Sequence, residues 1–178
     1  MTNKRPAGFT LLELLISISL LAILLVTAVP SFLDAIQNNR LTSQANEFVT
    51  AMQLARSEAL KRNRPVTVCA SDTSAETPSC GGAWTDGWIV ATDANGAGDN
   101  SVSVSEILRV WPAVTGNSTI TPSDSETFVR YLPRGEVDTA AATFPIVFQL
   151  RIPHCTRDSA RDIRIVAGGR AIVERVEC

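Results

Sequence analysis

The chain has 178 residues, with 16 basic and 18 acidic side chains and a formal net charge of −2. This length allows one globular domain and a further segment, and 45% hydrophobic residues exclude a disordered polar chain. The nearly balanced charge argues against a protein that mainly coats nucleic acid. Because His154 is the one histidine, multi-histidine metal sites are excluded and a Ser-His-Asp triad is disfavoured.

The first predicted element is an apolar helix that begins at Phe9. Residues Phe9 to Val29 read FTLLELLISISLLAILLVTAV and contain one charged side chain, Glu13. As a helix this run is roughly 31 Å long, enough to cross the hydrocarbon core of a bilayer. Lys4 and Arg5 precede it, which predicts a cytoplasmic N-terminus and an external globular part. The run is too long for an ordinary secretory signal, and a plain anchor would leave Glu13 unexplained.

A second helical pattern follows Pro30. Apolar residues recur there at spacings of three and four, which places them on one face of a helix. They are Leu41, Ala45, Phe48, Met52, Ala55 and Ala59. The two patterns together predict one long helix, with a transmembrane half and an amphipathic half that packs on a sheet. This helix is expected to end near Asn63, before Pro65.

Seven short strands are predicted after residue 64, separated by turns rich in glycine, asparagine, aspartate and serine. They are Val66–Ala70, Gly87–Thr92, Ile107–Trp111, Thr127–Tyr131, Phe144–Arg151, Asp162–Val166 and Arg170–Val176. Because no further helical pattern occurs, the expected fold class is α+β, with antiparallel β-sheets packed on one helix. In an extended segment Ile163 and Ile165 share one face, and Asp162, Arg164 and Val166 the other.

The three tryptophans lie in or near predicted strands. They are Trp84, Trp88 and Trp111. A binding platform is one use for such side chains, but burial in the core is the expected one.

The N-terminal sequence resembles the leader of type IV pilin-like proteins. Two basic residues precede Gly8 and Phe9, and the run GFTLLELL places Glu13 one helical turn later. The resemblance implies that a prepilin peptidase cleaves between Gly8 and Phe9 and then N-methylates Phe9. It also implies an assembly role for Glu13, which neutralises the terminal amine of a neighbouring subunit. A buried charge is costly alone and tolerable in a pair.

Three later segments resemble the GspH/FimT family of type IV pilin-like proteins, which contains minor pilins and a type II secretion pseudopilin. They are AMQLARSEALKRNRPVTVCAS, the block WTDGWIV with DANG, and Gly169-Arg170 before a terminal cysteine. The ending with Cys155 and Cys178 is most similar to the FimU-like branch. The resemblance implies a type IV pilin fold and a non-enzymatic minor pilin, with no cofactor or metal. Such a subunit joins other minor pilins and the major pilin, primes pilus assembly and sits at the tip.

The resemblance also implies a division of the chain and a location. Residues 1–8 are the cleaved leader, 9–30 the transmembrane and filament-core helix, and 31–178 the globular domain. The protein is expected as a single-pass protein of the bacterial inner membrane with a periplasmic C-terminal domain. It then moves to the pilus fibre or tip at the cell surface.

Two alternative functions remain open within the family. FimT-like members linked to DNA uptake contact DNA through a C-terminal Gly-Arg-x-Arg motif, and here the second arginine is replaced by Ile172. Arg164 and Arg170 are the candidate DNA contacts, because arginines bind phosphate, although acidic residues are interleaved with them. The other alternative is a GspH-like minor pseudopilin of type II secretion, which uses the same leader.

Four cysteines without a Cys-x-x-Cys pair argue against a zinc ribbon or a thioredoxin-type site. Outside the membrane they are expected to form two disulfides. Three pairings are possible, and the local one, Cys69–Cys80 with Cys155–Cys178, is favoured. A thiol nucleophile at His154-Cys155 is disfavoured, because adjacent side chains rarely face each other.

The run from Asp93 to Asp99 has the beginning of a calcium-binding loop. An EF-hand needs acidic residues at the fifth and twelfth places, which hold Ala97 and Val104. The run is therefore expected to form a hairpin turn.

Overall fold

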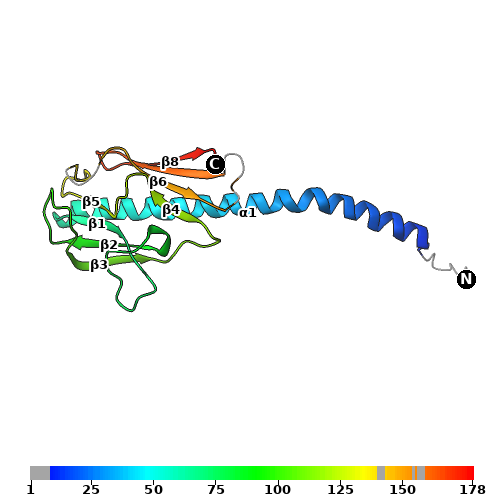
Figure 1. Ribbon diagram of the computed structural model, residues 1–178, viewed down its shortest axis with the longest axis horizontal. Helices are drawn as coiled ribbons and strands as arrows, with labels where there is room; N and C mark the ends of the chain where they lie inside the picture. Colours follow the sequence, from blue (N-terminus) through cyan, green and yellow to red (C-terminus); the bar gives the residue numbers. More distant parts are fainter. Residues whose placement is uncertain (1–8, 140–142, 154, 156–158) are drawn as a thin grey trace, which may run out of the picture. The chain divides into compact units, whose positions relative to one another are not determined.

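The computed structural model describes residues 9–139, 143–153, 155 and 159–178 (Figure 1). Gly8 and His154, which the sequence singled out, lie outside the described residues. The chain divides into two compact units, Met1–Asn39 and Arg40–Cys178. Each unit contains part of a single 52-residue helix, α1 (Leu11–Arg62).

Local chemistry explains where α1 begins and ends. Thr10 precedes it, and its Oγ1 accepts a hydrogen bond from the Glu13 backbone N–H at 3.2 Å, as a helix-capping side chain does. The helix ends at Arg62, because Asn63 adopts a left-handed φ of +50°. The end lies within one residue of the predicted position.

The second unit contains two four-stranded antiparallel sheets. The first sheet has the order β3-β2-β1-β5, with β1 (Val66–Ala70), β2 (Trp88–Asp93), β3 (Val104–Trp111) and β5 (Phe128–Tyr131). The second sheet has the order β4-β6-β7-β8, with β4 (Thr119–Pro122), β6 (Ile146–Arg151), β7 (Ala160–Ile165) and β8 (Ala171–Val176). A short 3-10 helix, η1 (Trp84–Asp86), precedes β2. The α+β class and the antiparallel sheets are confirmed.

All seven predicted strands are present, and the structure contains an eighth strand that was not predicted. The missed strand is β4, which has four residues, ends in Pro122 and buries Ile120 alone. Four residues with one buried side chain give too weak an alternation to be recognised. β6 begins two residues later than predicted, at Ile146, after Pro145, which has no N–H to donate to a ladder.

One hydrophobic core joins α1 to both sheets. The predicted stripe on α1 is fully buried, and in Figure 1 the cyan part of the helix runs between the two sheets. At its centre the Phe48 ring lies 5.1 Å from the Trp88 ring of the first sheet and 4.8 Å from the Phe148 ring of the second. Trp84, Trp88 and Trp111 are all buried. The tryptophans therefore pack in the core and do not form a surface platform.

Two disulfides close segments of the second unit. Cys69 in β1 bonds to Cys80, with Cα atoms 5.4 Å apart, and so anchors the loop that follows β1. Cys155 bonds to Cys178, with Cα atoms 5.7 Å apart, and so ties the end of β8 to the segment after β6. This is the local pairing among the three that four cysteines allow.

Candidate functional site

The first candidate site is the apolar surface of α1 in the first unit. Its large hydrophobic side chains are exposed, from Phe9 through Leu33. Among the described residues, α1 is the one helix whose length and composition suffice to cross a membrane. Ser17 and Ser19 add no free polar group, because their hydroxyls donate to backbone carbonyls one turn earlier, both at 2.7 Å.

Glu13 is the one charged residue between Phe9 and Leu33. Its side chain is exposed and has no ion-pair partner among residues 9–139 and the later described segments. Its backbone N–H is satisfied by Thr10, so the helix start is already capped without using the carboxylate. In an apolar environment this carboxylate needs a cation from another molecule.

The second candidate site is the C-terminal group of arginines. Arg164 on β7 pairs with Glu174 on β8 at 3.2 Å, and both side chains are nearly half exposed. Arg151 likewise pairs with Asp162 at 2.8 Å. Ile163 and Ile165 are buried, and Asp162 and Arg164 are only partly buried, as expected for an alternating strand. Interleaved acidic residues thus neutralise much of this sheet face.

Arg170 differs from these paired arginines. It is exposed in the turn between β7 and β8, and its side chain makes no hydrogen bond or ion pair within the described part of the chain. The preceding Gly169 has a φ of +80°, and a β-carbon there would lie 2.2 Å from the backbone oxygen of Gly135. The two turns that contain Gly135 and Gly169 are therefore in direct contact.

Two further arginines lie beside these two turns. The Nε of Arg56 on α1 lies 3.2 Å and 3.4 Å from the positions that β-carbons would take on Gly135 and Gly169. Arg134, next to Gly135, is largely exposed and pairs with Glu136 at 2.6 Å. We call Arg56, Arg134 and Arg170 the arginine junction. Sequence reasoning missed Arg56 and Arg134, because nothing local indicates that these distant segments meet.

A buried tyrosine lies beneath the arginine junction. The Tyr131 hydroxyl has no hydrogen-bond partner among the described residues. Burial raises the pKa of Tyr131 above its ordinary value, and the nearby charge of Arg56 offsets part of that increase.

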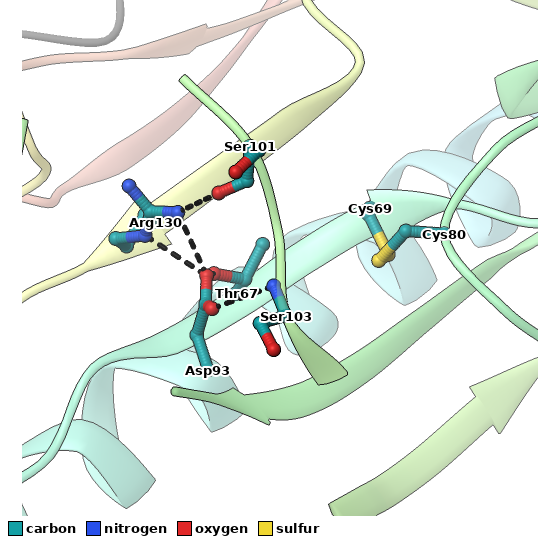
Figure 2. The surroundings of a disulfide bond; sticks show 7 residues. All are labelled: Thr67, Cys69, Cys80, Asp93, Ser101, Ser103 and Arg130. Carbon is teal, nitrogen blue, oxygen red and sulfur yellow. Dashed lines mark hydrogen bonds and ion pairs between the residues drawn. A yellow bond between two sulfur atoms is a disulfide. The ribbon is translucent and has the colours of Figure 1, made fainter. Parts of the chain in front are cut away.

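The third candidate site is the connection between β2 and β3, residues 94–103. Figure 2 shows Asp93, at the end of β2, facing Arg130 of β5 across the sheet. Asp93 Oδ2 accepts hydrogen bonds from Arg130 Nε at 2.9 Å and from Thr67 Oγ1 at 2.8 Å. Asp93 Oδ1 accepts the backbone N–H groups of Asn95 at 3.0 Å and Ser103 at 2.9 Å. One carboxylate thus holds both ends of the connection.

The expected hairpin is present, because β2 and β3 pair as antiparallel neighbours, although residues 94–103 connect them in place of a short turn. The connection is a longer loop that lies over Arg130, whose guanidinium donates to the backbone oxygens of Asp99 and Ser101. The N–H and hydroxyl of Ser101 bind the Asp99 carboxylate and lower its pKa. Among the described residues no group of three or more His, Cys, Asp or Glu side chains is arranged to hold a metal.

A capped apolar helix that continues into a disulfide-tied, two-sheet α+β domain is the architecture of pilin-like subunits. The family model of the type II transport protein GspH matches residues 44–169, more than half of the chain, and the chain belongs to this family. Residues 3–29 match the prokaryotic N-terminal methylation motif. Proteins of this family and fold are structural subunits and not enzymes.

Two crystal structures of the type IV minor pilin FimU from Pseudomonas aeruginosa strain PAO1 share the fold. One has a TM-score of 0.60 and 21% identity, over 76% of this chain and 89% of that chain. The other has a TM-score of 0.56 and 20% identity, over 75% of this chain and 91% of that chain. No curated protein matches the sequence.

Proposed function

We propose that the chain is a minor type IV pilin, which helps to prime pilus assembly and sits at the pilus tip. The observation that carries this proposal is the lone Glu13 carboxylate on an exposed apolar helix, one turn after Phe9. The two FimU structures that share the fold are those of a minor pilin, which supports the same role here.

The proposed mechanism is assembly after proteolytic processing. A prepilin peptidase cleaves between Gly8 and Phe9, and the new amine of Phe9 is methylated. The Glu13 carboxylate of one subunit then pairs with the terminal amine of a neighbour. An unpaired charge in the apolar filament core costs about 3–5 kcal/mol, so pairing selects the axial register. The domain of residues 31–178 faces the periplasm before assembly and contacts neighbouring minor pilins afterwards.

The experiment is to measure incorporation of variants into sheared filaments. Glu13→Ala and Glu13→Gln are expected to reach the membrane in normal amounts and to be reduced at least tenfold in filaments. Ser17→Ala is the matched control, because it removes one hydroxyl from the same helix and leaves the charge. Normal incorporation of Glu13→Gln would show that charge pairing is not the mechanism.

A deletion strain separates the pilus role from the secretion role. Loss of surface pili with normal secretion supports the minor pilin. Loss of type II secretion with intact pili would instead assign the GspH-like pseudopilin role, which the matched family description raises.

The arginine junction favours DNA binding as a second candidate function. Arg134 and Arg170 are exposed on two turns that touch, Arg56 borders both turns, and Glu136 is the one acid that pairs with these arginines in the described structure. Full-length protein in detergent micelles is titrated with fluorescent duplex DNA at several salt concentrations. If DNA binds, Arg134→Ala with Arg170→Ala should lower the salt slope by about one for each phosphate that is no longer bound. Arg164→Ala, which removes an arginine outside the arginine junction, is the control.

A further inference from the structure

The Arg130 guanidinium occupies a position that resembles the centre of a metal-binding loop. Both the Asp93 and Arg130 side chains are 0% exposed, and Asp138 is 4% exposed. We propose that Arg130 is a built-in cation that replaces a divalent metal ion in the β2–β3 loop. A chain without this guanidinium should therefore bind Ca²⁺ at the same position.

The hydrogen-bond acceptors around the guanidinium are all oxygen atoms, and its central carbon lies 5.0 Å from the centre of the Phe128 ring. Asp93 Oδ2 lies 2.9 Å from Arg130 Nη2, and Asp138 Oδ2 lies 3.4 Å from Arg130 Nη1. The backbone oxygens of Asp99 and Ser101 also accept hydrogen bonds from the guanidinium. Two carboxylates and two carbonyls without nitrogen or sulfur are the donor set of a hard cation.

The charge of the site also matches a divalent ion. Two buried carboxylates carry two negative charges, and Arg130 supplies one positive charge. Removal of Arg130 leaves both carboxylates buried without their shared cation, which strongly disfavours the folded state. A Ca²⁺ ion restores neutrality, and its 6–8 oxygen ligands at about 2.3–2.6 Å allow water to complete the shell. Mg²⁺ requires shorter distances and a near-ideal octahedron, so it should bind less well.

The same carboxylates couple this cation to the order of the loop. Asp93 binds Arg130 through Oδ2, while its Oδ1 accepts the N–H groups of Asn95 and Ser103. Asp138 Oδ2 contacts Arg130 and also accepts the Gly98 N–H at 2.7 Å. Loss of the cation should therefore release the loop at both ends and at its middle, and a replacement cation should order it again.

The test uses full-length protein in detergent micelles, stripped of metals with EDTA. Thermal unfolding is followed by tryptophan fluorescence, which reports on the second unit because all three tryptophans lie there. Arg130→Ala should have a lowered Tm in EDTA, and Ca²⁺ at a hundredfold excess over Kd should raise it by about 5–10 °C. The unsubstituted protein should respond neither to EDTA nor to Ca²⁺.

Two further variants control for the mechanism. Arg130→Met fills the space without a charge, so it should be destabilised and should gain nothing from Ca²⁺. Arg130→Ala with Asp138→Asn should bind Ca²⁺ at least tenfold more weakly than Arg130→Ala, as measured by equilibrium dialysis. If Arg130→Ala does not stay folded in EDTA, its refolding yield from urea should rise with Ca²⁺.

Three outcomes would overturn the proposal. The first is a Ca²⁺-dependent Tm of the unsubstituted protein, because the site would then already need a metal. The second is an Arg130→Ala chain that neither binds Ca²⁺ nor refolds better in its presence. The third is an equal Ca²⁺ response of Arg130→Ala and Arg130→Met, which would place the ion elsewhere.

Discussion

The backbone oxygen of Gly135 lies 2.2 Å from the position that a β-carbon would take on Gly169. Gly169 thus meets Gly135 at a distance that leaves no room for any side chain. This contact joins the turn after β5, in the first sheet, to the turn between β7 and β8, in the second. The glycine of the Gly169-Arg170 pair therefore has a packing role that is independent of any ligand.

We expect Gly169→Ala to lower the free energy of unfolding by about 2–4 kcal/mol, from left-handed strain and overpacking together. A β-carbon at Gly168 meets nothing within 4 Å, so Gly168→Ala should change stability by less than about 0.5 kcal/mol. Urea unfolding of the full chain in detergent, followed by tryptophan fluorescence, measures both. Equal stability of the two variants would contradict the packing role.

Phe48→Ala should cost about 3–5 kcal/mol of unfolding free energy, because the Phe48 ring contacts aromatic rings of both sheets. Phe48→Leu keeps most of the volume and should cost roughly half as much. Gln53→Ala, on the exposed face of the same helix, is the control. A loss confined to one sheet, seen by amide hydrogen exchange, would mean that Phe48 does not join the two.

The stability of the protein should fall in alkali because of Tyr131. The folded state keeps a phenolic proton that the unfolded chain releases above its ordinary pKa of 10.0. The free energy of unfolding should therefore decrease as the pH rises beyond that value. Tyr131 is the single tyrosine, so the ultraviolet absorbance of tyrosinate reports on it directly. Titration of this absorbance before unfolding would contradict the burial argument, and Tyr131→Phe should reduce the alkaline loss.

The two disulfides should differ in their resistance to reduction. Cys69 is fully buried in β1, whereas Cys178 is exposed. Mild dithiothreitol should therefore open Cys155–Cys178 first, as mass spectrometry after alkylation would show. Each bond is expected to contribute about 3 kcal/mol through loop entropy. Faster reduction of Cys69–Cys80 would indicate that the loop after β1 opens readily.

Periodicity predicted the packed half of α1 and the alternating strands β6 and β7, which bury one regular face, whereas β1 and β2 are buried at every position and were recognisable as short apolar runs between turn residues. The stripe from Leu41 to Ala59 shows this most clearly, since every expected member is buried. Local pairing of the cysteines followed from chain proximity. β4 was not predicted, because four residues with one buried side chain show no periodic pattern of hydrophobic residues.

The Arg130 centre could not be predicted for a different reason. The sequence indicated Asp93 and the loop after it, but the cation comes from β5 and the second carboxylate from Asp138. The arginine junction likewise depends on a contact between two glycines in different turns. Long-range pairing of this kind follows from strand order and register, which periodicity does not specify.

Phe48 and Phe148 stand a hundred positions apart in the chain, yet their rings lie 4.8 Å from each other. During synthesis the stripe on α1 emerges long before β6, so it has no second sheet to cover it. Contacts between such distant segments form slowly, because the chain loses loop-closure entropy before these contacts can stabilise the fold. We therefore expect the nascent domain to need protection from aggregation until its last strands have emerged. Insertion of the apolar part of α1 into a membrane would keep such chains apart.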